Sequence, residues 1–307
     1  MQQRLFAFSA ARLGGAALTV VSLATLSACG GNGNGGSDTP GTPTATVTAM
    51  SASAPKYSGT ATITINGTGL DSTLAVSSPI CTSVALQAGG TTTTATYKCT
   101  VSGGITGAVV VKSNGTQVGT TTLTVPQPVI RMMVNNGLSA VGNIDITLAA
   151  DKAPKTVDNF LHYVNTGFYD NTIFHRVVTG FIMQGGGYTA QVTNLSTAAL
   201  KTGLFAPIAV ESTGLSNVSG TLSMANANTS SNTVTTTSQF FFNLGNNAFL
   251  DGGYPVFGTI TAGTSVVSAI VTASTTSPSS CVANQAANTT DCLPIPNVVI
   301  TSATQIQ

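Results

Sequence analysis

Apolar and polar residues alternate along much of residues 44–125, a stretch rich in Thr, Ser, Gly, Ala and Val. The clearest alternation covers 61–65 and 121–125. Asn-Gly pairs at 66–67 and 114–115 are typical of turns between such runs, and no helical period is visible. Short strands separated by glycine-rich turns predict a small β-sandwich over residues 44–125, which we interpret as an Ig-like domain.

The pattern changes after the prolines at 126 and 128, which predict a stiff linker. Apolar residues then recur at helical spacing over residues 154–165, on one face formed by Val157, Phe160, Leu161 and Val164. Pro154 suits the first turn of this helix, and Gly167 suits its C-terminal exit. A second short helix is expected at 265–271.

Strand-like runs dominate the rest of the chain. They cover 129–134, 143–148, 174–177, 181–184, 221–224, 240–243, 256–260 and 298–301. By itself, this pattern predicts a mainly β domain with two helices over residues 129–307.

The N-terminus has the pattern of a secretory signal. Arg4 and Arg12 come before and at the start of an apolar run over about 13–28, which ends in small residues before Cys29. The run is short for a membrane-spanning helix, which needs roughly 20 apolar residues. We therefore predict a signal peptide over residues 1–28, removed from the mature protein.

The end of this signal, Leu26-Ser27-Ala28-Cys29, resembles a bacterial lipobox, in which the cysteine becomes the acylated first residue. The alternative is an ordinary cleaved signal followed by a free thiol. Residues 29–43, rich in Gly, Asn and Pro, predict a flexible tether. Because Gly30 rather than Asp follows the cysteine, the resemblance favours a lipid-anchored protein of the bacterial cell envelope, at the outer membrane and facing the periplasm.

Cysteine usage fits that compartment. The chain has five cysteines, and assigning Cys29 to lipid leaves two local pairs, Cys81–Cys99 and Cys281–Cys292. Two disulfides fit an oxidising environment. The wide separation of the pairs and the presence of only two histidines disfavour a metal site, and neither pair has the spacing of a redox motif. The separation of 81 from 99 is short for the inter-sheet bridge of immunoglobulin domains, and the chain lacks tryptophan.

Charged side chains are few, with 10 Lys+Arg and 9 Asp+Glu in 307 residues. Loss of the signal would remove two of the ten basic residues and leave a nearly neutral chain. Nucleic acid is excluded as a partner because its binding calls for a basic stripe. Attachment to a membrane would depend on the lipid rather than on charge.

One arginine, Arg176, lies in an apolar segment bounded by glycine, Phe-His-Arg-Val-Val-Thr-Gly-Phe-Ile-Met-Gln-Gly-Gly at 174–186. Three further motifs follow: Leu-Ser-Met-Ala-Asn-Ala at 222–227, Ser-Gln-Phe-Phe-Phe-Asn at 238–243 and Phe-Leu-Asp-Gly-Gly-Tyr-Pro-Val-Phe-Gly at 249–258. In this order and spacing the four motifs resemble the cyclophilins, a family of peptidyl-prolyl cis-trans isomerases. The resemblance implies an eight-stranded closed β-barrel, capped by two helices, over residues 129–307.

The implied reaction is rotation about an X–Pro bond, which has a barrier of about 20 kcal/mol because amide resonance is lost. No covalent bond breaks, so no metal or other cofactor is required. An apolar site must hold the proline ring, and a donor must stabilise the twisted amide, whose nitrogen becomes pyramidal and more basic. An arginine against apolar walls is a donor that keeps its proton.

The resemblance assigns roles to particular residues. Arg176 would be the catalytic donor, and Gln184 would orient it and contact the substrate. The residues expected to line the proline site and its rim are Phe181, Ile182, Ala225, Asn226, Phe241, Phe249, Leu250 and Tyr254. Phe249 and Tyr254 stand where many cyclophilins have tryptophan and histidine, a departure that resembles bacterial periplasmic members.

Simpler interpretations apply to several of these residues. Phe181, Phe241 and Leu250 could be ordinary core. We interpret His175 as structural because strand alternation points it away from Arg176. The glycines at 185–187 lack the Gly-Lys-Ser/Thr of a phosphate-binding loop.

The leading hypothesis is a lipid-anchored isomerase that assists the folding of proline-containing, unfolded or partly folded envelope proteins. One alternative is a non-catalytic module that binds proline-containing segments, although binding alone would not need both Arg176 and Gln184. A second is an adhesion or structural lipoprotein that depends on residues 44–125. That region shows no cluster of carboxylates, histidines or basic residues, so a spacer is its simplest role.

Overall fold

The structure is a computed structural model that describes residues 44–228, 235–273, 275 and 292–307. The predicted signal peptide (1–28) and tether (29–43), including the proposed lipid site Cys29, lie outside the described residues, as does Cys281. Within the described ranges, the structure contains no helix with the length and apolar character needed to cross a membrane.

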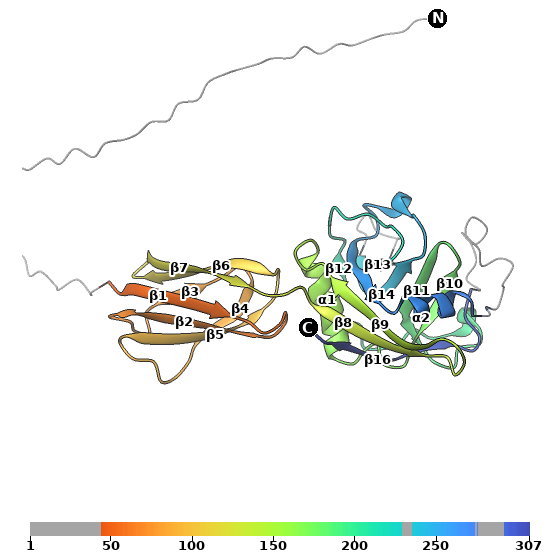
Figure 1. Ribbon diagram of the computed structural model, residues 1–307, viewed down its shortest axis with the longest axis horizontal. Coiled ribbons are helices and arrows are strands. Elements are labelled where there is room, and N and C mark those ends of the chain that lie inside the picture. The colour runs from red at the N-terminus through yellow and green to blue at the C-terminus, as the bar shows by residue number, and fades with distance from the viewer. Residues whose placement is uncertain (1–43, 229–234, 274, 276–291) are drawn as a thin grey trace, which may run out of the picture. The chain divides into compact units, whose positions relative to one another are not determined.

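The first described region contains seven strands in two antiparallel sheets (Figure 1). One sheet has the order β1-β2-β5-β4 and the other β3-β6-β7. The strands are β1 (Thr46–Ser53), β2 (Thr60–Thr68), β3 (Ala75–Ser77), β4 (Cys81–Leu86), β5 (Thr94–Val101), β6 (Thr106–Ser113) and β7 (Thr116–Thr124). This distribution of strands is that of the seven-stranded constant-type immunoglobulin sandwich. The Ig-like prediction is confirmed.

The predicted alternation forms the core of this sandwich. Ile63 and Ile65 of β2, Val109 and Val111 of β6, and Leu123 of β7 are fully buried. Thr62 and Thr64, which alternate with Ile63 and Ile65 along β2, are less buried, as period-two alternation requires. Each such apolar side chain contributes roughly 1.5–3 kcal/mol when fully buried.

The predicted Cys81–Cys99 disulfide is present and joins neighbouring strands, with a Cα–Cα distance of 5.5 Å. Cys81 and Cys99 lie on β4 and β5, which are paired within one sheet. The bond therefore differs from the inter-sheet bridge of antibody domains, as its short sequence separation of 18 residues indicated.

The two Asn-Gly pairs have different roles. Asn114 and Gly115 have φ values of 50° and 80° and form the turn between β6 and β7, as predicted. The prediction of a turn at 66–67 is wrong, because that pair lies inside β2. There, β1 and β2 shift register, and a Cβ on Gly67 would collide with the carbonyl oxygen of Thr46. This glycine permits a close approach of two backbones.

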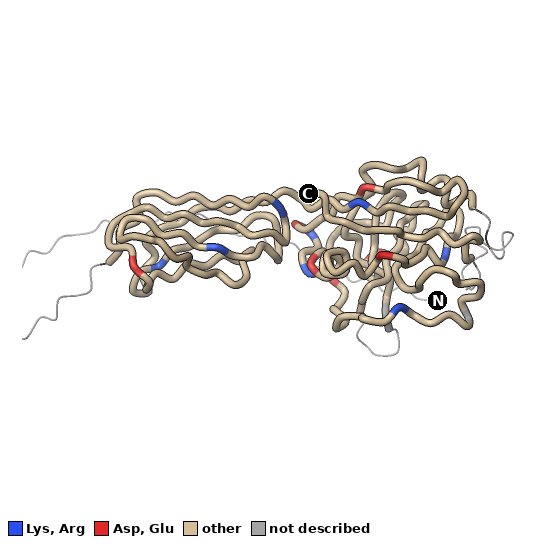
Figure 2. Tube along the Cα trace, turned by 90° about the horizontal axis from the view of Figure 1, so that it is seen from below, with Lys and Arg blue, Asp and Glu red and all other residues tan. Residues whose placement is uncertain are grey.

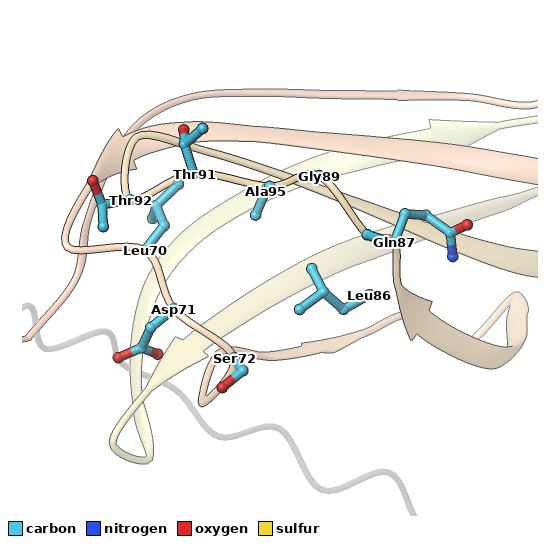
Figure 3. Close-up of a pocket in the computed structure, with 11 residues that line it drawn as sticks. Leu70, Asp71, Ser72, Leu86, Gln87, Gly89, Thr91, Thr92 and Ala95 are labelled. Atoms are coloured by element: carbon cyan, nitrogen blue, oxygen red, sulfur yellow. The ribbon is translucent and has the colours of Figure 1, made fainter.

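Loops and strand ends of the sandwich line an open hollow of about 470 Å³ (Figure 3). Leu70, Leu86 and Ala95 supply apolar walls, and Asp71 is the one ionisable residue in its lining. The Asp71 carboxylate accepts hydrogen bonds from the backbone and the hydroxyl of Thr73. A lone carboxylate held in a local turn offers no partner for acid–base chemistry, so the hollow suggests no catalytic role.

The remaining strands form a closed barrel. Their order is β11-β10-β16-β8-β9-β15-β13-β14, and β14 pairs in turn with β11, while the short β12 (Ile208–Ala209) joins β14. The eight barrel strands are β8 (Val129–Asn135), β9 (Val141–Leu148), β10 (Thr172–Val178), β11 (Ile182–Thr189), β13 (Thr221–Asn228), β14 (Thr235–Asn243), β15 (Val256–Ala262) and β16 (Val298–Gln305). The closed eight-stranded barrel implied by the sequence is confirmed.

Both predicted helices are present (Figure 1). Helix α1 (Pro154–Asn165) buries the apolar face formed by Val157, Phe160, Leu161 and Val164. The ring of Phe160 lies 5.6 Å from that of Phe240 and 5.0 Å from that of Phe257, so α1 packs on the barrel core. Gly167, at φ 68°, follows the helix end. Helix α2 (Thr264–Val271) begins one residue before its prediction.

Positions of charged residues are scattered singly or in small groups along the described part of the trace, with no continuous run of one sign in the view of Figure 2. Arg131 of β8 forms an ion pair with Asp145 of β9 through two hydrogen bonds of 2.7 Å. The Arg131 guanidinium lowers the pKa of the Asp145 carboxyl.

Candidate active site

Arg176 lies on β10 in register with Gln184 on β11. The pairing of these strands shifts register between Phe174 and Arg176. Such an irregularity changes the direction in which the following side chain, here that of Arg176, leaves the strand. The Arg176 guanidinium carbon is 5.7 Å from the centre of the Phe181 ring, a cation–π distance. Burial lowers the pKa of Arg176, and the nearby Tyr254 opposes this effect. The side chain stays charged near neutral pH because an unperturbed guanidinium loses its proton only above about pH 12.

Gln184 is held from the opposite side by a third strand. Its Nε2 donates a hydrogen bond of 2.9 Å to Oε1 of Gln239 on β14. Gln184 is also the register partner of Phe241 on that strand. The amide of Gln184 is therefore fixed between the strand that carries Arg176 and the strand that carries Phe241.

Alternate residues of the strands serve two separate apolar clusters. Phe240 and Phe242 of β14 belong to the barrel core, whereas Phe241 faces the other way. Met183 and Ile182 of β11 divide in the same manner. The outward-facing group, which we call the site cluster, consists of Phe181, Ile182, Ala225, Phe241, Leu250 and Tyr254.

The site cluster combines a buried floor with partly exposed walls. Phe241 is 2% exposed, and the ring of Tyr254 lies 5.7 Å from it at 73°. Phe181 and Leu250 are half-buried at the margin. These residues are thus not part of the barrel core, which was the alternative for Phe181, Phe241 and Leu250.

Two of the predicted substrate-binding residues, Phe249 and Asn226, have distinct properties. Phe249 is 75% exposed, and its ring lies nearly parallel to that of Phe181 at 6.0 Å. Asn226, next to Ala225 on β13, has a buried Oδ1 with no hydrogen-bond partner among the described residues. A buried acceptor without a partner costs about 1–3 kcal/mol. The N–H of a bound peptide could donate to this Oδ1 and remove that cost.

His175 points away from this surface. It is 5% exposed, and its ring lies 4.8 Å from that of Tyr188. Burial lowers the pKa of His175 to about 4. The neighbouring glycines serve packing, because a Cβ on Gly186 would lie 2.9 Å from atoms of both Phe240 and Tyr169.

Several site residues went unrecognised in the sequence. Gln239 lies within the motif at 238–243, where it ends a polar run that directly precedes three phenylalanines, and nothing in that run distinguishes it. Asn217, Asn243 and Asn247 form a buried network of amide hydrogen bonds, and Asn217 also donates to Asp251. Asn217 lies outside all four motifs, and nothing in the local sequence marks it.

Gln239 should affect catalysis through Gln184. We expect Gln239→Ala to lower kcat/KM by about five- to tenfold, because the net value of one hydrogen bond is roughly 1 kcal/mol. Isomerisation kinetics of wild type, the two single variants Gln184→Ala and Gln239→Ala, and the double variant would measure the coupling. If the two losses simply add, the two side chains act independently and the expectation is wrong.

A closed antiparallel barrel of eight strands, with a cation beside an outward-facing apolar cluster, defines a cyclophilin-type protein. The family model described as cyclophilin type peptidyl-prolyl cis-trans isomerase/CLD matches residues 129–305, more than half of the chain. The chain belongs to this family and is a cyclophilin-type peptidyl-prolyl cis-trans isomerase.

Individual relatives are similar to this chain over part of its length. Peptidyl-prolyl cis-trans isomerase A of Dickeya dadantii is 43% identical over 138 residues, which cover 43% of this chain and 67% of the relative. A peptidyl-prolyl cis-trans isomerase of Acinetobacter baylyi is 45% identical over 136 residues, covering 42% and 67%. A crystal structure of a cyclophilin type isomerase from Cryptosporidium parvum, 23% identical, covers 59% of this chain and 99% of that chain with a TM-score of 0.44.

Proposed function

We propose that this isomerase catalyses X–Pro rotation in proteins of the bacterial envelope, with Arg176 as the catalytic donor and the site cluster as the proline site. The observation that carries the proposal is the position of the Arg176 guanidinium, 5.7 Å from the Phe181 ring at the margin of that cluster. A proline ring seated on Phe241 would place its imide nitrogen near a fixed positive donor.

The chemistry follows from differential binding. A planar amide offers its nitrogen weakly as an acceptor, whereas the twisted amide has a pyramidal nitrogen with a free lone pair. A hydrogen bond from Arg176 to that nitrogen therefore strengthens as the bond rotates. A rate gain of about 10⁵ requires only about 7 kcal/mol, and one charged donor in a partly desolvated site supplies roughly half of it.

The rest of the peptide would bind in an extended form along the rim. The Oδ1 of Asn226 supports this arrangement, because it has no hydrogen-bond partner in the described part of the chain and a peptide N–H would satisfy it. Gln184, held by Gln239 at 2.9 Å, can contact the peptide on the side of Arg176.

Activity distinguishes this function from that of a binding module. We would measure cis-to-trans conversion of a proline-containing peptide by residues 44–307 and titrate the same peptide by fluorescence. The proposal requires catalysis well above the uncatalysed rate. Tight peptide binding by a folded protein without catalysis would instead indicate the non-catalytic alternative.

The envelope location makes a separate prediction at Cys29. In a Gram-negative host, we expect the full chain to label with palmitate and to fractionate with membranes. The variant Cys29→Ser should lose both properties, because the acyl chains are the proposed anchor. The double variant Cys81→Ser/Cys99→Ser is the control, since it removes the sandwich disulfide without leaving a free thiol and keeps Cys29. Membrane association that survives in Cys29→Ser would overturn the lipid anchor.

A further inference from the structure

Asn217 occupies a central position that its place in the sequence does not suggest. It precedes β13, is fully buried, and uses its backbone and its side chain to connect segments far apart in the chain. Burial of an amide costs free energy unless each of its polar atoms forms a hydrogen bond. The hydrogen-bond partners of Asn217 therefore show which segments it stabilises.

One side of Asn217 holds the segment 247–254, which carries three predicted site residues. The backbone N–H and Nδ2 of Asn217 both donate to Oδ1 of Asp251, at 2.8 and 2.9 Å. Nδ2 also lies 3.2 Å from the carbonyl oxygen of Tyr254 and donates to it. The carbonyl oxygen of Asn217 accepts a hydrogen bond of 2.7 Å from the backbone N–H of Asn247.

The other side of Asn217 is fixed to the barrel. Its Oδ1 accepts hydrogen bonds of 2.7 Å from Ser223 of β13 and 3.0 Å from Nδ2 of Asn243 of β14. Ser223 is the register partner of Phe241, the floor of the site cluster. Asn217 therefore connects the floor of the proposed proline site to the segment that forms its wall.

The wall segment has little regular structure of its own. It contains one short 3₁₀ turn, η2 (Ala248–Leu250), followed by Gly252 at φ 80° and Gly253. A second attachment comes from Asn247, whose Nδ2 donates to the carbonyl oxygen of Phe181 and to Oδ1 of Asn243, both at 2.8 Å. Hydrogen bonds to the network, rather than a helix or strand, set the position of Leu250 and Tyr254.

We propose that Asn217 is a positioning residue for the isomerase reaction. Asn217 sets the distance of Leu250 and Tyr254 from Phe241, and this distance determines how well the proline ring fits. Asn217 touches no substrate. The proposal rests on the site cluster being the proline site, and Arg176 tests that assignment independently.

A positioning role predicts a particular kinetic signature. The wall contacts the proline ring equally in the planar and the twisted amide. Displacement of the wall therefore weakens the binding of the ground state and of the transition state by the same amount. KM should rise about tenfold in Asn217→Ala, whereas kcat changes less than about twofold. Loss of folded protein alone would lower apparent kcat and leave KM unchanged.

The variant Asn217→Asp provides a sharper test, because it is nearly isosteric. It keeps the acceptor for Ser223 and Asn243 but replaces the Nδ2 donor by a carboxylate oxygen facing Asp251. A proton on the new carboxyl restores the donor, and the adjacent Asp251 carboxylate favours that proton. KM of Asn217→Asp should therefore fall toward the wild-type value as pH decreases from 8 to 5.

The experiment measures kcat and KM for wild type, Asn217→Ala, Asn217→Asp and the control Asn143→Ala, an exposed asparagine of β9. We expect KM to be raised at every pH in Asn217→Ala, to recover at low pH in Asn217→Asp only, and to be unchanged in the control. Asp251→Asn, at an exposed position, serves if the Asn217 variants do not fold, with KM raised about two- to fivefold. Wild-type KM in the folded variants overturns the proposal. If Arg176→Ala retains full activity, the site assignment itself fails.

Discussion

Arg176→Ala is expected to lower kcat/KM by a factor of about 10²–10³, the usual cost of removing one donor that acts on the transition state. The loss should appear in kcat, with KM little changed, because the hydrogen bond to the imide nitrogen forms only as the amide twists. The relevant structural fact is the position of the guanidinium at the edge of the site cluster, next to Phe181.

Two further variants make the Arg176 result specific. Arg176→Lys keeps the charge but not the planar fork of donors, so its activity should fall between those of alanine and wild type. Arg131→Ala removes a different arginine, which pairs with Asp145 on the barrel surface. That variant should keep wild-type activity and lose at most about 1 kcal/mol of stability. Unchanged kcat/KM in a folded Arg176→Ala protein would contradict the assigned donor.

Acid should destabilise the protein through His175. Its folded-state pKa is lowered to about 4, from an ordinary value of 6.5, by burial. Between these values the unfolded state binds more protons than the native state, so this group costs no stability above about pH 6.5, the free energy of unfolding decreases as pH falls from 6.5 to 4, and the loss levels off below about pH 4. The shift corresponds to about 3 kcal/mol lost from the free energy of unfolding over that window.

Urea unfolding between pH 7.5 and 4, followed by circular dichroism, measures this loss. The variant His175→Gln cannot gain a proton, so its free energy of unfolding should depend much less on pH over the window. His162→Gln replaces the other histidine, on the exposed side of α1, and should retain the wild-type dependence. Equal pH dependence in wild type and His175→Gln would show that another group is responsible.

Helices and strands that depend on the local sequence pattern could be predicted from the sequence. Contacts that depend on the packing of distant segments could not. Helix α1 has both predicted ends, because its apolar spacing and Pro154 are local signals. The motif at 66–67 misled, since Gly67 is required by its neighbour strand β1 rather than by a turn. A glycine needed for a turn and one needed for close approach have the same appearance in a sequence.

The site shows the same division. Arg176, Gln184 and the apolar residues could be named from four motifs because their order and spacing carry the family resemblance. Asn217 could not, since its partner Asp251 lies 34 residues away and only the folded chain brings them together. The same holds for the pairing of Gln184 with Gln239, which are 55 residues apart.

The division of each strand between two apolar clusters has an evolutionary consequence. Phe240 and Phe242 maintain the barrel, while Phe241, between them, faces the site cluster. A substitution at an outward position alters which residues fit around proline without opening a cavity in the barrel core. The substrate preference of this surface can therefore change during evolution. The requirement that the chain remain folded constrains the inward-facing residues instead.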